Sequence, residues 1–141
     1  MKKIIFLVFI ALTFANCTKE TVRYKNPNIP NYSFSTTINI NLPSYSGLNS
    51  PVNPIYISQD GVGVNGIIVM KVSDTDFRAW EANCPNHPIS SCARMKINGI
   101  NAKCSCDDAE FSIFTGVGPG QYPMKPYAVE VLGNNTIRIY N

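Results

Sequence analysis

Two short stretches in the second half of the chain hold residues that could bind a metal or form disulfides. The first runs from Cys84 to Cys92 and contains His87, the single histidine of the sequence. The second runs from Cys104 to Asp108 with the letters CSCDD. Thiolates, imidazoles and carboxylates bind transition metals, and pairs of thiols also form disulfides. The chemistry of these two stretches therefore decides what the chain can do.

The cysteines allow only a few arrangements. Five are present, and if Cys17 is set aside as part of an export signal, Cys84, Cys92, Cys104 and Cys106 remain. Four cysteines allow three pairings. A bond between Cys104 and Cys106 is disfavoured, because residues one apart on a strand do not easily reach disulfide geometry. Bridges across the two stretches remain, so we expect the stretches to lie close together.

The N-terminus has the features of an export signal. Lys2 and Lys3 precede an apolar run, Ile4 to Ala15, which is too short for a membrane-spanning helix of about 20 residues. The run closes at Cys17 and resembles a bacterial lipoprotein signal, in which this cysteine is acylated. We therefore predict a signal over 1–17 and a lipid anchor in the bacterial cell envelope, on the periplasmic face or the cell surface. A plain cleaved signal, with an ordinary Cys17, is the alternative.

Charge and signal type narrow the function further. The formal charge is +3, and removal of Lys2 and Lys3 leaves ten basic residues against nine acidic ones. Because no Lys/Arg-rich patch remains, we expect no nucleic-acid partner. The signal has no twin arginine, which indicates export as an unfolded chain into an oxidising compartment where disulfides persist.

The remainder of the chain divides into a tether and one domain. Residues 18–31 are polar, contain two prolines and show no apolar periodicity, which predicts a flexible tether. Residues 32–141 have the length of one ordinary domain. Alternating apolar residues from Phe34 to Leu42 indicate a half-buried strand. No segment carries a sustained helical pattern, and Pro43 to Pro54 reads as a loop.

Many short apolar runs separated by turn residues predict an all-β domain, a sandwich or a barrel of small sheets. Asn98-Gly99 and Gly133-Asn134 are hairpin-turn dipeptides between such runs. The further expected strands are Ile55–Ile57, Gly66–Val72, Phe77–Ala82, Met95–Ile97, Ile100–Cys104, Phe111–Phe114, Tyr127–Leu132 and Thr136–Tyr140.

The order of small motifs from about residue 66 onward resembles a Rieske-type iron–sulfur domain. The segment 77–85 (FRAWEANCP) looks like the strand that enters the first ligand loop, and 104–111 (CSCDDAEF) looks like the second loop. The segment 115–131, with Gly118-Pro119-Gly120, resembles the closing part of the domain. The resemblance implies a fold of small antiparallel sheets with a cluster-binding subdomain built from loops near 84–92 and 104–108.

The resemblance also implies residue roles. A Rieske site holds one iron with two cysteines and the other with two histidines. Cys84 and Cys104 match the cysteine ligands, and Cys92 with Cys106 would form the bridge between the loops. Asn86 and Asp107 occupy the histidine positions. The first hypothesis is therefore a [2Fe–2S] cluster held by Cys84, His87, Cys104 and Asp107, which exchanges single electrons with a redox partner protein.

Two alternatives stay open at this point. A cluster-free descendant of the fold would join Cys84 to Cys104 and Cys92 to Cys106, and would be a binding or structural lipoprotein. A zinc site would use Cys84, His87, Cys104 and Cys106, although an oxidising compartment competes for these thiols. One histidine gives little basis for acid–base catalysis. The sequence thus indicates an electron-transfer or binding module rather than an enzyme, with no catalytic residue assigned.

Overall fold

The computed structural model describes residues 24–141, so the predicted signal over 1–17, Cys17 and the first part of the tether lie outside the described residues. Between residues 24 and 141, no helix combines the length and apolar character that a bilayer span requires. The described elements are β1 (Ser35–Asn39), η2 (Pro43–Asn49), β2 (Ile55–Ile57), β3 (Ile67–Lys71), β4 (Phe77–Glu81), β5 (Lys96–Asn98), β6 (Asn101–Lys103), β7 (Glu110–Ser112), β8 (Pro126–Gly133) and β9 (Thr136–Tyr140).

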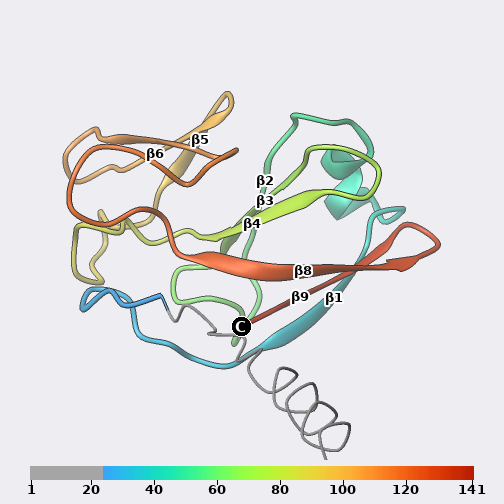
Figure 1. Ribbon diagram of the computed structural model, residues 1–141, viewed down its shortest axis with the longest axis horizontal. Coiled ribbons are helices and arrows are strands. Elements are labelled where there is room, and N and C mark those ends of the chain that lie inside the picture. The colour runs from blue at the N-terminus through green and yellow to red at the C-terminus, as the bar shows by residue number, and fades with distance from the viewer. Residues whose placement is uncertain (1–23) are drawn as a thin grey trace, which may run out of the picture.

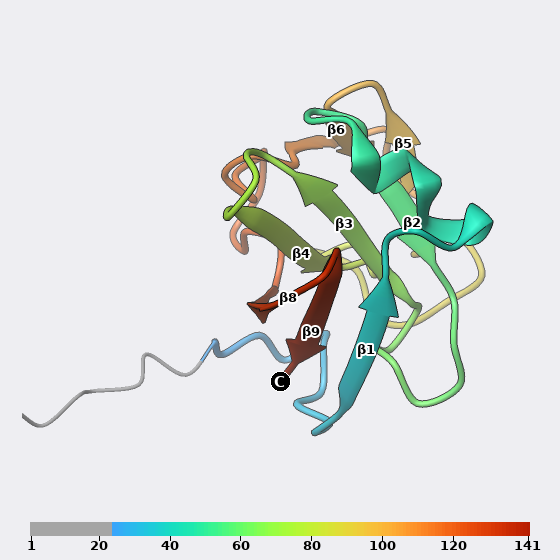
Figure 2. The same ribbon diagram turned by 90° about the vertical axis from the view of Figure 1, so that its right-hand side faces the viewer.

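The strands form two antiparallel sheets. The larger has six strands in the order β1-β9-β8-β4-β3-β2, and the smaller has three in the order β5-β6-β7. The large sheet is strongly curled, and the small sheet stands at the end toward which β4 runs (Figures 1 and 2). The predicted all-β class of small antiparallel sheets is confirmed. One cysteine-bearing loop leads into β5 and the other joins β6 to β7, so these loops and the three-stranded sheet form a small subdomain.

Strand β3 explains how one short chain builds two cores. Its first four residues, IIVM, form a continuous buried apolar run before Lys71, as expected for a strand covered on both faces. Ile67 and Val69 belong to a core with β1, β9 and η2, whereas Ile68 and Met70 point to the other face. The second core also contains Trp80, Ala82, Cys84, Ala93, Met95, Ala102, Cys104, Phe111, Ile113 and Met124. The two candidate iron ligands Cys84 and Cys104 are thus part of this second core.

The segment expected as a loop over Pro43 to Pro54 contains a short helix instead. η2 is a 3-10 helix with Pro43 in its first turn, where a missing N–H costs nothing. Leu48 in this helix is fully buried in the first core. Burial of one leucine thus organises a segment whose sequence shows only turn residues.

Candidate functional site

Both loops of the small subdomain begin where a strand ends. The first follows β4, and the N–H of Cys84 donates to the carbonyl of Ala93 at 2.6 Å. The second follows β6, and the N–H of Cys104 donates to the carbonyl of Ala109 at 2.8 Å. Each loop therefore closes on itself at its first cysteine, which brings these two cysteines to defined positions at the ends of β4 and β6.

Two disulfides join the loops. Cys84 is bonded to Cys104 with an S–S distance of 2.05 Å and a Cα–Cα distance of 5.6 Å. Cys92 is bonded to Cys106, with a Cα–Cα distance of 5.0 Å. Cys84 and Cys104 are each 1% exposed, whereas Cys92 lies at the surface. Of the cross-loop pairings that the residues left open, this is the pairing of the cluster-free alternative.

His87 and Asp107 make a third connection between the loops. The Nε2 atom of His87 lies 2.8 Å from Oδ2 of Asp107, and the two side chains are 32% and 41% exposed. The N–H of Ala109 donates to Oδ1 of Asp107 at 3.1 Å. The hydrogen bond from His87, followed by that from Ala109, holds the pKa of the Asp107 carboxyl below its usual range. Asp107 is therefore an ionised, oriented carboxylate at neutral pH.

The predicted ligands gather at one place. Donor atoms of His87, Cys104 and Asp107 all lie within 4.8 Å of one another. The Sγ atoms of Cys84, Cys104 and Cys106 form a second group within the same distance. The fold thus brings together His87, Cys104 and Asp107 of the predicted ligands, and Cys84 is bonded to Cys104 in the buried disulfide.

Asn86, at the first histidine position of the resemblance, makes a different kind of contact. Its amide bonds four backbone groups of the third loop, residues 118–122. The Nδ2 group donates to the carbonyls of Pro119 and Tyr122 at 3.2 Å each, and Oδ1 accepts the N–H groups of Gln121 and Tyr122 at 2.9 Å each. Asn86 therefore ties the first loop to the third. Asn86 was considered above only as a residue at a ligand position, and no local sequence pattern signals its structural role.

This disulfide-bonded form does not fit a [2Fe–2S] cluster. Iron ligation in such a centre requires cysteine thiolates, and the Sγ atoms of Cys84 and Cys104 are bonded to each other. The amide of Asn86 is already saturated by backbone groups. Three of the four positions that the resemblance assigns to ligation, Cys84, Asn86 and Cys104, thus serve to hold the loops together.

A buried carboxylate supports the first loop from below. Glu81, at the end of β4, is fully buried and accepts four hydrogen bonds. Its donors are the N–H groups of Val64, Asn65 and Asn83 and the hydroxyl of Tyr127, the last at 2.6 Å. Burial, followed by the negative charge of Glu81, raises the pKa of Tyr127 far above its usual range, so this hydroxyl remains a donor.

Asn83 carries this support into the loop itself. It is fully buried, and its Nδ2 group donates to the carbonyls of Cys84 at 2.9 Å and His87 at 3.2 Å. Its Oδ1 atom accepts a hydrogen bond from the side chain of Asn65 at 2.6 Å. The backbone on which His87 stands is therefore fixed by a hydrogen-bond chain from the core. Neither Glu81 nor Asn83 was predicted as a functional residue. The available signal was an acidic residue directly after Trp80 in the strand FRAWE.

The chain before β1 lies against the site rather than away from it. From Tyr24 onward the segment expected as a flexible tether is described, and Ile29 is 2% exposed. Asn26 and Asn28 both donate to the carbonyl of Pro85, at 2.7 and 3.0 Å. Tyr24 donates to the carbonyl of Pro123 at 2.6 Å. In Figure 1 this segment, drawn in blue, runs along the loop that follows β4. The segment thus braces the first loop through Asn26 and Asn28, and the end of the third loop through Tyr24.

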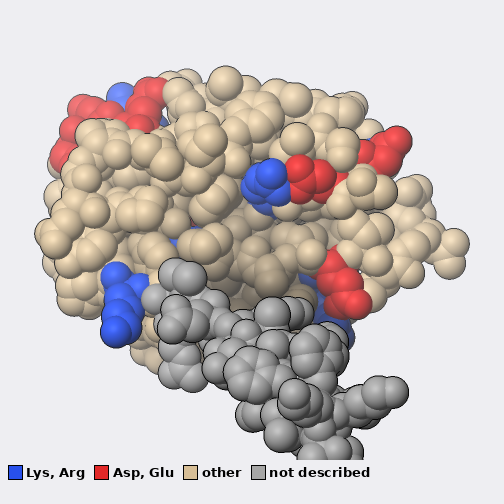
Figure 3. Space-filling view, in the orientation of Figure 1, with Lys and Arg blue, Asp and Glu red and all other residues tan. Residues whose placement is uncertain are grey.

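Surface charges are arranged in small groups. On the face in Figure 3, charged side chains lie in a few small groups, several with a basic side chain beside an acidic one, and wide uncharged areas separate the groups. Near the site, Lys103 pairs with Asp108 at 2.9 Å, with both side chains substantially exposed. Exposed pairs of this kind contribute little to stability, because water and salt screen the two charges. Disulfides and buried hydrogen bonds, rather than surface ion pairs, therefore hold the loops in place.

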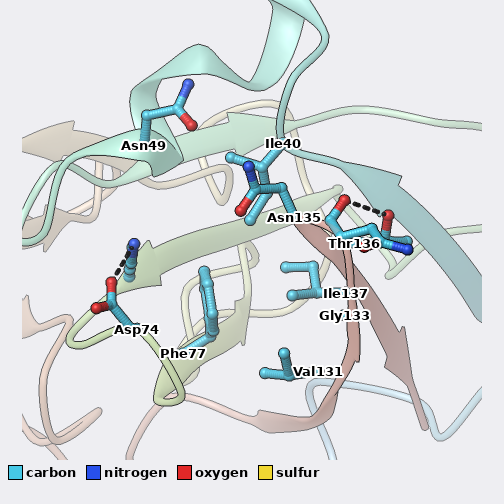
Figure 4. A pocket seen from close by; sticks show the side chains of 11 residues that line it. Ile40, Asn49, Asp74, Phe77, Val131, Gly133, Asn135, Thr136 and Ile137 are labelled. Atoms are coloured by element: carbon cyan, nitrogen blue, oxygen red, sulfur yellow. Dashed lines mark hydrogen bonds and ion pairs between the residues drawn. The ribbon is translucent and has the colours of Figure 1, made fainter.

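A separate pocket lies between the turn after β3 and the β8–β9 hairpin. It has a volume of about 260 Å³, and Phe77, Val131 and Ile137 form its apolar part. Asn135 in the hairpin turn lies across the pocket from Asp74 (Figure 4), and Asn134 also lines the pocket. None of the residues predicted to bind a cluster lines this pocket.

Comparisons with known proteins give similarities of fold. No family model matches the chain, and no curated protein matches it. A chain of the complex of reduced oxygenase and oxidised ferredoxin in carbazole 1,9a-dioxygenase is 22% identical over 63% of this chain and 81% of that one, with a TM-score of 0.44. The ferredoxin of carbazole 1,9a-dioxygenase from Nocardioides aromaticivorans IC177 is 19% identical over 65% and 89%, with a TM-score of 0.44.

A third structure comes from Mycobacterium tuberculosis and is assigned as an NADH-dependent nitrite reductase small subunit. It is 14% identical, covers 79% of this chain and 97% of its own, and has a TM-score of 0.46. At these low identities, the similarity is one of strand arrangement alone. The chemistry of the present site rests on its own residues.

Proposed function

We propose that the protein is an exported, lipid-anchored Rieske-like domain that works without a cluster, as a binding module of the bacterial cell envelope. The anchor is the acylated Cys17 predicted from the signal. The disulfide between Cys84 and Cys104 replaces the first iron, and the bridge between Cys92 and Cys106 closes the loops beside it. Two such bridges stabilise the folded state by about 2–4 kcal/mol each.

The observation that carries this proposal is that residues at the ligand positions are already bonded to other parts of the protein. The cysteines are paired with each other, and the Asn86 side chain is fully engaged by the third loop. An unfolded, exported chain arrives in an oxidising compartment, where disulfide formation needs no cluster-assembly machinery. The loops keep their close arrangement by covalent bonds, and their surface is available for a partner of the cell envelope.

The convergence of Cys84, His87, Cys104 and Asp107 favours a second candidate function, one-electron transfer through a [2Fe–2S] cluster with a redox partner protein. This would require Cys84 and Cys104 to be reduced in the native protein. One more anionic ligand and one fewer imidazole would then lower the reduction potential relative to a centre with two histidines.

Iron and acid-labile sulfide content per chain separates the two candidates. Mature protein should be recovered from its native envelope without air, with thiols blocked at lysis. The cluster-free proposal predicts neither iron nor sulfide and no alkylated cysteine in the two loops. About two irons and two sulfides per chain, with a coloured protein that bleaches in acid, would refute it in favour of electron transfer.

The anchor is tested separately. A Cys17→Ser variant should lose incorporation of a labelled fatty acid and move from the membrane fraction to the soluble fraction. The control is Cys92→Ser, which removes a cysteine of the folded domain and should keep the label. Equal labelling of the Cys17→Ser variant and the unchanged chain would refute the lipid anchor.

A further inference from the structure

Three potential metal ligands from two loops lie close together in the disulfide-bonded protein, and a fourth, Cys84, is bonded to one of them. The donor atoms of His87, Cys104 and Asp107 lie within 4.8 Å of one another, and Cys84 is bonded directly to Cys104. His87 and Asp107 are partly exposed, whereas the two cysteines are buried beneath them. The group therefore forms a site with a closed apolar base and a side open to solvent.

The spacing suits a single ion. Zinc binds sulfur at about 2.3 Å and nitrogen or oxygen at about 2.0–2.2 Å, so neighbouring donors of a tetrahedral ion stand roughly 3.3–3.8 Å apart. The distance of 2.8 Å between His87 and Asp107 has to open by roughly half an ångström to reach this spacing. By contrast, a [2Fe–2S] cluster would have Cys84 and Cys104 on one iron and His87 and Asp107 on the other.

The disulfide controls whether the site can form. The Sγ atoms of Cys84 and Cys104 bond each other, so neither is a thiolate in this state. A dithiol reductant supplies two electrons and two protons, breaks the S–S bond and becomes a disulfide itself. A divalent ion then displaces both thiol protons and takes the two thiolates as ligands.

We propose that reduction of the Cys84–Cys104 disulfide converts the paired loops into a site for one divalent ion of the zinc class, with Cys84, His87, Cys104 and Asp107 as ligands. In the oxidised state the same residues brace the loops. In the reduced state the ion joins the loops in place of the lost covalent bond. Metal binding is thus coupled to the thiol redox state of the surroundings, beyond the binding role proposed above.

Zinc titration of the full mature domain in two redox states tests the proposal. One sample is untreated, and the other is reduced with a phosphine, which does not compete as a thiol ligand. A chromophoric chelator reports competition for Zn²⁺, and circular dichroism reports folding. The expected result is about one Zn²⁺ per reduced chain and no competition by the oxidised chain. Substitution with Co²⁺ should add a thiolate-to-cobalt absorption band only after reduction.

Two neighbouring aspartates provide matched variants. Asp107→Asn should weaken Zn²⁺ binding by the reduced chain at least about tenfold, because even substitutions of residues that only support metal ligands commonly lower metal affinity by that factor. Asp108→Asn should leave affinity unchanged, because Asp108 pairs with Lys103 on the surface. Asp108 has a φ of 61°, a left-handed conformation that asparagine tolerates. Both variants keep side-chain size, so they differ only in the carboxylate removed.

A Cys92→Ser, Cys106→Ser double variant distinguishes this ligand set from one containing Cys106. After reduction it should still bind Zn²⁺. If it does not fold, the Asp107 and Asp108 pair decides instead. Equal binding by oxidised and reduced chains, equal effects of the two aspartate variants, or cooperative uptake of two ions would refute the proposal. So would Zn²⁺ binding by a reduced chain that stays unfolded. None of these outcomes changes the iron and sulfide content of the native protein, so the cluster-free function is tested independently.

Discussion

Asn86 allows the sharpest test of how the site is held. Its side chain makes four hydrogen bonds to backbone groups of residues 119–122, across 33 to 36 positions of sequence. Each bond contributes about 0.5–1.5 kcal/mol net. Because the side chain is only half-buried, some of the freed backbone groups can bind water after truncation. We therefore expect Asn86→Ala to lower the free energy of unfolding by about 2 kcal/mol.

Urea denaturation without reductant, followed by tryptophan fluorescence, measures this loss. With a slope near 2 kcal/mol per molar, the midpoint should fall by about 1 M. Asn53→Ala is the control, because Asn53 makes one exposed side-chain bond, to the carbonyl of Gly47 at 3.1 Å. Its midpoint should move by less than about 0.3 M, since surface changes usually stay within 0.5 kcal/mol.

A second substitution tests whether the contact is the cause. A Cβ atom on Gly120 would lie 2.4 Å from Nδ2 of Asn86, and Gly120 has a φ of 99°. Gly120→Ala should therefore destabilise through both a clash and backbone strain. In the Asn86→Ala background the clash disappears, so the double variant should lose about 1 kcal/mol less than the sum of the single losses. Full additivity, or an unchanged midpoint for Asn86→Ala, would refute the reasoning.

Three further predictions concern the same region. Without reductant the four cysteines of the two loops should not react with a thiol reagent in denaturant, and two or more free thiols would contradict the pairing. The pKa of Asp107, measured from its carboxyl ¹³C shift, should lie below the usual value of about 3.9 and should rise in the His87→Ala variant. The contribution of this carboxylate to stability is present above the usual pKa and is lost as the pH falls through the lowered one. A pKa that does not change in the variant would contradict the prediction. Tyr127→Phe should cost about 2 kcal/mol in urea denaturation, because it removes a hydrogen bond to the buried carboxylate of Glu81, and unchanged stability would argue against that bond.

The strands were largely predictable because their signals are local. Alternation before Asn39 and the apolar run over 67–71 depend on which residues face a core, and a period of two along a strand records this directly. The hairpin between β8 and β9 turns at residues with positive φ, including Asn134 and Asn135. Asparagine favours that conformation, so the turn dipeptide was a sound guide.

The short helix η2 and the segment before β1 were not predicted, because their order comes from contacts distant in sequence. Leu48 orders η2 by entering a core made by other strands. Asn26 orders the N-terminal segment through a bond to Pro85, 59 residues later. Neither contact leaves a pattern in the neighbouring residues, and polar composition alone reads as flexible chain.

The sequence by itself determined the all-β class, the positions of the two loops and the residue types available to them. The choice of disulfide partners was enough to expect the two loops near each other, because a Cys104–Cys106 bond is disfavoured and bridges across the loops remain. Only the tertiary structure decided how the available groups are used. It pairs the cysteines, directs Asn86 to the third loop, and sets His87 against Asp107. Whether a side chain binds a metal, a backbone group or another side chain depends on which partner is nearest in space, and distances between loops are fixed by the packing of the sheets beneath them.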